Sequence, residues 1–143
     1  MPLFLTERDV QALVGWDDMP EAIDRIEHAY REKAAGRATC FPRATVQYPP
    51  EHGYYTDVTI RILPGIVPAL DSAAVRIYAN HHERPVAERG PRALDFVMAD
   101  ELLLYWRYSE GMRLAAIMAD YWLMNIRTAA PTGVATRWLA RND

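Results

Sequence analysis

The chain has 143 residues, half of them hydrophobic and 24% charged, with a formal net charge of −3. This length predicts one domain over residues 1–143, and the composition excludes a disordered chain. The acidic balance disfavours nucleic acid as a partner, the single cysteine excludes an internal disulfide, and no apolar run is long enough to cross a membrane. The start lacks a basic region followed by a long apolar one, so we expect a cytoplasmic protein.

The first third of the chain predicts two helices. Thr6 can cap a short helix over residues 6–14. A longer helix is expected over residues 20–35, because its apolar residues recur at spacings of three and four. Pro20 suits its first turn, and Gly36 is placed to end it.

The middle of the chain alternates apolar and polar residues, which predicts a meander of strands. The first strand covers residues 58–62 and is expected to end at Pro64, since proline interrupts strand pairing. Residues 81–92 are polar and predict a loop. The other strands are expected at residues 73–80, about 94–98, 101–108 and 112–118.

The last segment, residues 120–140, predicts a helix. Pro131 removes the hydrogen bond to the carbonyl of Arg127, so we expect either a kink or two helices that meet end to end. The fold class is therefore α+β: N-terminal helices packed on a mostly antiparallel or mixed sheet, closed by a C-terminal helix kinked near Pro131. No Gly-x-Gly-x-x-Gly turn occurs, so neither a Rossmann domain nor a dinucleotide site is expected within this chain.

Three arginines stand in settings that suggest a ligand. Arg43 comes just before a strand, Arg76 lies in the middle of an apolar strand, and Arg127 lies in an apolar helix. A buried guanidinium keeps its proton and must find an anionic or carbonyl partner. Converging arginines would form a carboxylate pocket, with Tyr78 and Asn80 on the same side of the strand as Arg76. The alternative is ordinary ion pairing with acidic residues, or exposure at a strand edge.

Two other features predict little chemistry. The run His81-His82-Glu83 contains metal-ligand side chains, but it falls in the expected loop, so we predict a solvated segment and no metal site. Cys40 has no activating partner in the sequence, and a buried, inert thiol is expected.

At the arginines the sequence resembles the ornithine cyclodeaminase/mu-crystallin family, specifically its N-terminal substrate-binding and dimerisation half. The matching segments follow one another in order along nearly the whole chain. They are Phe4-Leu5-Thr6, Met19-Pro20-Glu21-Ala22-Ile23, Pro42-Arg43-Ala44-Thr45, Leu63-Pro64-Gly65, Ala74-Val75-Arg76, Leu114-Ala115-Ala116-Ile117-Met118, Ile126-Arg127-Thr128-Ala129-Ala130 and Trp138-Leu139-Ala140-Arg141.

The resemblance implies roles for the arginines. Family members are NAD(P)-dependent and act on amino acids, imino acids or ketimines. By resemblance, Arg43 and Arg127 grip the substrate carboxylate, while Arg76 occupies a position where many members carry a lysine that assists proton transfer. Lys33, the only lysine of the chain, lies elsewhere. A guanidinium orients an anion well but is a poor general base, so Arg76 departs from the family pattern that serves deaminating chemistry.

The resemblance also implies that the family's Rossmann domain would begin where this chain ends, at Arg141-Asn142-Asp143. We therefore expect a truncated or stand-alone module that binds a small carboxylate and holds no cofactor itself. Three alternatives stay open. The chain is a subunit of a split ornithine cyclodeaminase or imine reductase whose Rossmann-containing homologue supplies NAD(P), a cofactor-free enzyme built on this scaffold, or a gene fragment without its own function. Uncovered apolar surface predicts an oligomer, either a homodimer or a heteromer with that homologue.

Overall fold

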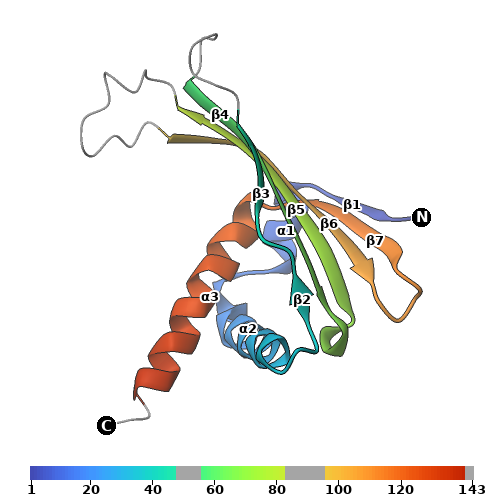
Figure 1. Ribbon diagram of the computed structural model, residues 1–143, viewed down its shortest axis with the longest axis vertical. Helices are drawn as coiled ribbons and strands as arrows, with labels where there is room; N and C mark the ends of the chain where they lie inside the picture. The colour runs from blue at the N-terminus through green and yellow to red at the C-terminus, as the bar shows by residue number, and fades with distance from the viewer. Residues whose placement is uncertain (48–55, 83–95, 141–143) are drawn as a thin grey trace.

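The computed structural model describes residues 1–47, 56–82 and 96–140, which build a mixed sheet with helices against one of its faces (Figure 1). The sheet has seven strands in the order β1-β7-β6-β5-β4-β2, and β3 also pairs with β4. The pairing of β1 with β7 is parallel and the others are antiparallel. The strands are β1 (Leu3–Leu5), β2 (Thr39–Cys40), β3 (Ala44–Gln47), β4 (Thr56–Val67), β5 (Ser72–His82), β6 (Phe96–Arg107) and β7 (Arg113–Ala119).

The α-helices are α1 (Glu7–Leu13), α2 (Met19–Ala34) and α3 (Tyr121–Leu139), with short 3-10 turns at Trp16–Asp18 and Pro68–Leu70. These elements and the mixed sheet confirm the expected α+β class. No helix in the described part of the chain is long and apolar enough to cross a membrane.

The helix ends follow the capping signals of the sequence. The Thr6 hydroxyl accepts a hydrogen bond from the Asp9 amide at 3.3 Å, and the Asp9 carboxylate accepts one from the Thr6 amide at 2.8 Å. This capping box satisfies two amides that helix formation leaves open at the start of α1. After α2, Gly36 adopts φ +71°, a conformation that favours glycine.

The C-terminal helix corrects one expectation. α3 is a single helix that continues past Pro131, so the alternative of two helices meeting end to end is wrong. Its buried residues, Ile126, Ala130 and Val134, pack toward the rest of the domain. Close contact with α2 depends on Gly133, because a Cβ at this position would lie 2.4 Å from Cδ1 of Ile23.

Strand β4 corrects the expected break at Pro64. Its pairing with β5 continues through Pro64, which lies opposite Val75. On the other edge, β3 ends its register at Ile62 and β2 begins at Gly65. The Pro64 carbonyl accepts a hydrogen bond from the Phe41 amide on that edge, at 3.2 Å. The missing N–H of proline therefore faces the gap between β2 and β3, where it interrupts no ladder.

The next strands are longer than expected. Residues 81 and 82, predicted as loop, belong to β5; residues 83–92 lie outside the described residues. The two strands expected near residues 94–98 and 101–108 are one strand, β6, although residues 94 and 95 are not described. Where a break was expected, the register with β5 shifts between Met98 and Glu101, as a bulge does.

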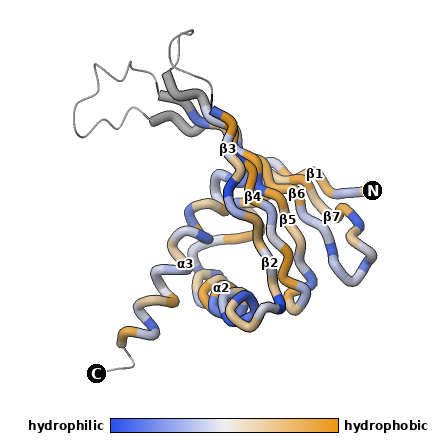
Figure 2. Tube along the Cα trace, viewed as in Figure 1, coloured by the Kyte–Doolittle hydropathy of each residue, from blue (hydrophilic) through white to orange (hydrophobic). Residues whose placement is uncertain are grey.

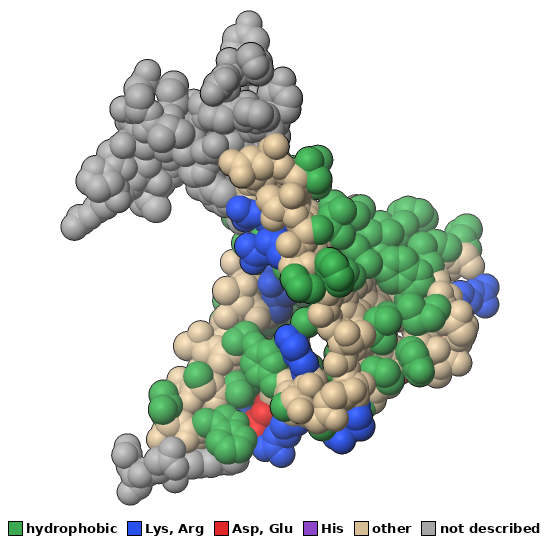
Figure 3. Space-filling model, viewed as in Figure 1, with side chains coloured by type: hydrophobic (Ala, Val, Ile, Leu, Met, Phe, Trp, Pro, Cys, Tyr) green, Lys and Arg blue, Asp and Glu red, His purple; other side chains and the backbone are tan. Residues whose placement is uncertain are grey.

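The two faces of the sheet differ in polarity. Adjacent residues of a strand point to opposite faces, so Arg61, Tyr78 and Glu101, which are register partners, share one face. The opposite face, which we call the apolar sheet face, carries exposed hydrophobic side chains. These are Phe4, Val46, Ile60, Ile62 and Leu102. Figure 2 shows hydrophobic residues along the strands and hydrophilic ones along much of α2. Figure 3 shows hydrophobic side chains gathered over the part of the sheet near β1 and β7.

Candidate functional site

A buried ion-pair cluster joins the sheet to the start of α3. Arg76, on β5, donates hydrogen bonds from Nη2 to Oε2 of Glu101 and from Nε to Oδ2 of Asp120. The side chains of Arg76, Glu101 and Asp120 are 11%, 0% and 1% exposed. The Asp120 amide also donates to the Glu101 carbonyl at 3.3 Å. The strand arginine thus holds together β6 and the segment that leads into α3.

Local structure explains why these groups meet. Tyr78 is the register partner of Glu101, and Arg76 lies two residues before Tyr78 on the same face of β5. Asp120 precedes α3 at the N-cap position, but its carboxylate caps no helix amide. It bonds Arg76 instead. Burial raises the pKa of Glu101 above its usual value, although the hydrogen bond from Arg76 acts in the opposite direction.

Arg127 lies beside this cluster with an open hydrogen-bond donor. Its Nε is 3.9 Å from Oδ2 of Asp120, its side chain is 40% exposed, and Nε itself is buried without a hydrogen-bond partner. Burial lowers the pKa of Arg127, and the positive charge of Arg76 lowers it further. An anion beside Arg127 would supply both the missing acceptor and a compensating charge.

Tyr78 is the hydrophobic centre of the cluster. The guanidinium carbons of Arg76 and Arg61 lie 4.2 and 5.7 Å from its ring centroid, and Arg61 Nη1 donates to the Tyr78 hydroxyl at 3.4 Å. Sequence reasoning missed Arg61. Its alternation with Ile60 and Ile62 puts it on the polar side of its strand, but only the register of β4 against β5 places it beside Tyr78.

The remaining expected site residues differ in their surroundings. Asn80 is 2% exposed; the Thr59 hydroxyl hydrogen-bonds its Oδ1, and its Nδ2 is buried without a partner. Arg43 immediately precedes β3, with an exposed side chain for which the described residues provide no hydrogen bond or ion pair. The structure therefore brings Arg76, Arg127 and Tyr78 together, extends the row to Asn80, and shows no contact between them and Arg43.

Basic side chains outnumber acidic ones on one face of the molecule (Figure 3). On the face drawn in Figure 3, Lys and Arg side chains form a column beside a hollow, and few acidic side chains are visible. Within the cluster, Arg76 and Arg127 pair with the carboxylates of Glu101 and Asp120, while Arg61 contacts Tyr78; three guanidinium groups thus stand against two carboxylates. One positive charge is left over, so the cluster suits an anion.

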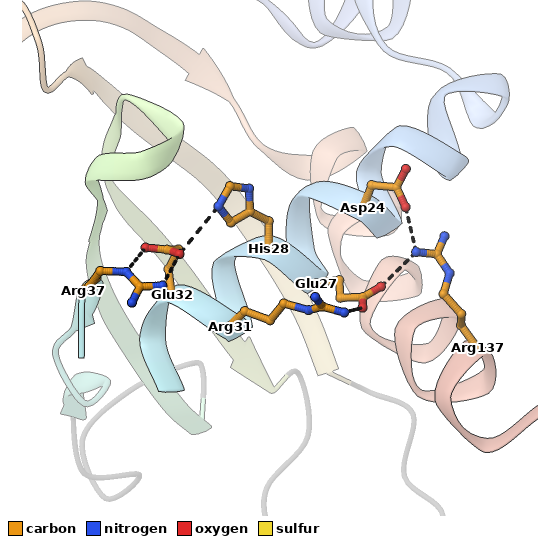
Figure 4. Close-up of a pocket in the computed structure, with 7 residues that line it drawn as sticks. All are labelled: Asp24, Glu27, His28, Arg31, Glu32, Arg37 and Arg137. Atoms are coloured by element: carbon orange, nitrogen blue, oxygen red, sulfur yellow. Dashed lines mark hydrogen bonds and ion pairs between the residues drawn. The ribbon is translucent and has the colours of Figure 1, made fainter. Parts of the chain in front are cut away.

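A second hollow, of about 550 Å³, lies along α2 and α3 (Figure 4). Its lining combines acidic side chains, arginines and one histidine: Asp24, Glu27, His28, Arg31, Glu32, Arg37 and Arg137. These charges already pair with one another, so a ligand would find few free groups. The hydrogen bonds of Arg137 to Asp24 at 2.7 Å and to Glu27 at 2.8 Å tie α3 to α2.

In the same hollow, ion pairing lowers the pKa of two carboxyl groups. The hydrogen bond from Arg31 lowers the pKa of Glu27, and the hydrogen bond from Arg37 lowers the pKa of Glu32. Both carboxylates therefore stay charged and occupied at neutral pH. We assign this hollow a structural role in packing the helices.

The described residues contain no group of three or more His, Cys, Asp and Glu side chains arranged to hold a metal ion. The side chains of His81 and His82 are outside the description, as is Glu83. Cys40 is exposed, so the expectation of a buried thiol is wrong.

Comparison with known proteins places the chain in context. The sequence model of the ornithine cyclodeaminase/mu-crystallin family matches residues 2–143. An alanine dehydrogenase from Archaeoglobus fulgidus is 28% identical over 141 residues, which are 99% of this chain and 38% of that protein.

Two solved structures share the fold. A probable ornithine cyclodeaminase from Bordetella pertussis superimposes with a TM-score of 0.66 at 17% identity, over 92% of this chain and 34% of that one. The iminosuccinate reductase of Paracoccus denitrificans, solved in complex with NAD+, gives 0.61 at 17% identity, over 92% and 36%. The chain thus spans little more than a third of the length of these proteins.

Proposed function

Since the chain belongs to the ornithine cyclodeaminase/mu-crystallin family, we propose that it binds a small carboxylate, an amino, imino or keto acid, at the cluster around Arg76 and Arg127. One observation carries this proposal. Arg127 Nε is buried, has no acceptor, and lies next to a second guanidinium. Such a buried donor has lost its hydrogen bonds to water and gained none from the protein. A carboxylate would supply a charged acceptor whose shape matches a guanidinium.

Each residue has a distinct part in this binding mode. Arg127 receives the carboxylate, while Arg76 stays fixed between Glu101 and Asp120 and contributes positive charge. Tyr78 forms the floor through its buried ring. By family resemblance, Arg43 is a second grip on the ligand, and this role remains a prediction. None of the arginines serves as a base, because a guanidinium keeps its proton near neutral pH.

Isothermal titration calorimetry with L-alanine, pyruvate, L-lactate and L-malate tests the proposal. The wild type is expected to bind at least one of these acids, and Arg127→Ala to bind it about tenfold or more weakly, as the loss of a charge-assisted hydrogen bond implies. Arg113→Ala is the matched control, since Arg113 is an exposed arginine on β7. Binding by none of the acids, or equal binding by both variants, would contradict the proposal.

A second function is favoured by the relatives. The iminosuccinate reductase contains NAD+, and this chain covers 36% of its length. The described residues offer no glycine-rich turn between a strand and a helix, so they do not fit a dinucleotide. In this alternative, a Rossmann-containing homologue supplies NAD(P) and this chain supplies the substrate site. Co-purification from the native host tests it; a chain recovered only with copies of itself would count against it.

The apolar sheet face supports a further proposal, that the chain forms a homodimer or joins that homologue through this surface. Val46 and Ile60 are 68% and 46% exposed there, and such surface is commonly buried by association. Light scattering at tens of micromolar is expected to give twice the mass of the chain for a homodimer, and Ile60→Glu to give a monomer. A monomeric wild type would contradict self-association. The expected cytoplasmic location remains a prediction.

A further inference from the structure

In the described part of the chain, the buried side-chain donors without a hydrogen-bond partner are concentrated at one place. Among the described residues, the buried side-chain nitrogens without a hydrogen-bond partner are Arg61 Nε, Asn80 Nδ2 and Arg127 Nε. All three belong to the cluster around Tyr78. The proposed carboxylate fills the donor of Arg127 and leaves those of Arg61 and Asn80 open.

Arg61 and Asn80 are placed to act on one group. Arg61 is the register partner of Tyr78, and Asn80 lies two residues further along β5, opposite Thr59. Arg61 and Asn80 are therefore diagonal neighbours on the same face of an antiparallel pair, a separation that long side chains can bridge. The Thr59 hydroxyl donates a hydrogen bond to the side-chain carbonyl oxygen of Asn80. The side-chain amino group of Asn80 is therefore free to donate to a ligand.

Arg61 is also a cation without an anionic partner in the described part of the chain. Its one hydrogen bond goes to the Tyr78 hydroxyl, at 3.4 Å. Arg76 contrasts with it, because two buried carboxylates neutralise its charge. Both guanidinium carbons lie within 5.7 Å of the Tyr78 ring centroid. Open donors thus occur on two sides of Tyr78: that of Arg127 beside Arg76 and Asp120, and those of Arg61 and Asn80 beside Tyr78 on β4 and β5.

We propose that Arg61 and Asn80 bind a second acidic group, so that the preferred ligand is a short dicarboxylate whose other carboxylate lies at Arg127. This inference rests on the proposed function and names its ligand class. A donor pair made of one guanidinium and one amide matches a carboxylate, whereas an apolar or amine-bearing ligand end would leave both donors unfilled. Arg61 is accordingly the residue that separates diacids from monoacids.

The test compares two acids that share a 2-hydroxy acid head, L-malate with two carboxylates and L-lactate with one. Calorimetry is carried out on the wild type, Arg61→Gln and the control Arg113→Gln, and circular dichroism checks the fold of each. The wild type and the control are expected to bind malate at least about tenfold more tightly than lactate. Arg61→Gln is expected to lower malate affinity to that of lactate and to leave lactate affinity unchanged.

A second variant keeps the test decisive if Arg61→Gln fails to fold. Asn80→Asp preserves the shape and the oxygen that pairs with Thr59, but it opposes a second carboxylate; it is expected to weaken malate and spare lactate. Equal affinities of the wild type for both acids, or equal weakening of both by Arg61→Gln, would overturn this inference and leave the proposed carboxylate site standing. If the wild type binds neither malate nor lactate, the inference is overturned. If it also binds neither L-alanine nor pyruvate, the proposed function is overturned as well.

Discussion

Replacing Arg76 by leucine removes the shared counter-ion of two buried carboxylates. Glu101 and Asp120 would then remain at 0% and 1% exposure without a hydrogen-bonded cation, and only Asp120 would keep an ion pair, at 3.9 Å to Arg127. Breaking a buried ion pair from one side costs about 3–5 kcal/mol, because the charge left behind has lost its hydration and its partner. A domain of this size has a free energy of unfolding on the order of 5–15 kcal/mol, so we expect Arg76→Leu to be severely destabilised at neutral pH.

The loss of stability caused by Arg76→Leu is expected to depend on pH in a defined direction. Burial raises the pKa of Glu101 and Arg76 opposes that rise, so removing Arg76 raises the folded-state pKa of Glu101 further above the unfolded value; the folded state then holds more protons than the unfolded state. Stability of the variant therefore falls as pH rises through the folded pKa values and recovers as pH drops toward the usual carboxyl range near 4.5. The gap between variant and wild type should be widest at neutral pH and narrowest in acid.

Urea denaturation followed by tryptophan fluorescence measures the effect. With a slope of about 1–3 kcal/mol per molar urea, the midpoint of Arg76→Leu is expected to fall by on the order of 2 M at pH 7. Arg25→Leu is the control, since Arg25 and its partner Glu21 are 62% and 68% exposed and such pairs contribute little. An unchanged midpoint, or a deficit of the same size at every pH, would refute the reasoning.

Three further changes test other parts of the structure. Glu101→Gln should remove the loss of stability that the wild type shows as pH rises above about 4.5, because burial raises the pKa of this carboxyl; melting temperatures from about pH 4 to about pH 8 check it. Thr6→Ala should cost about 1 kcal/mol by opening the capping box of α1, and an unchanged urea midpoint would argue against that role. Gly133→Ala should cost about 1–3 kcal/mol by forcing Ile23 aside, whereas Gly15→Ala, with open space around it, should show no such loss in thermal melts.

Local signals in the sequence were sufficient for the helices. Thr6, Pro20 and Gly36 act within one or two turns, so their capping effects do not depend on the rest of the fold. The strand ends were harder to predict. Pro64 normally interrupts a ladder, and it is tolerated here only because two separate short strands leave a gap beside it. That gap is a property of the sheet as a whole.

The same distinction applies to the site. Arg76 and Arg127 were identifiable because each is a cation embedded among apolar residues of its own segment. Their partners were not, since Glu101 and Asp120 join the cluster through strand register and through the start of α3. Arg61 alternates with apolar residues as many exposed strand arginines do, and its position beside Tyr78 follows from pairing between β4 and β5.

The short strands at the margins of the sheet have a consequence for how copies of the chain can meet. One margin is β1, with three residues, which pairs with β7; the other is formed by β2 and β3, with two and four residues, which pair with β4. Short borders offer few free backbone groups to an incoming strand, which blunts lateral growth into fibres. If the proposed association through the apolar sheet face occurs, we therefore expect a closed, face-to-face assembly and no growth along the sheet edges.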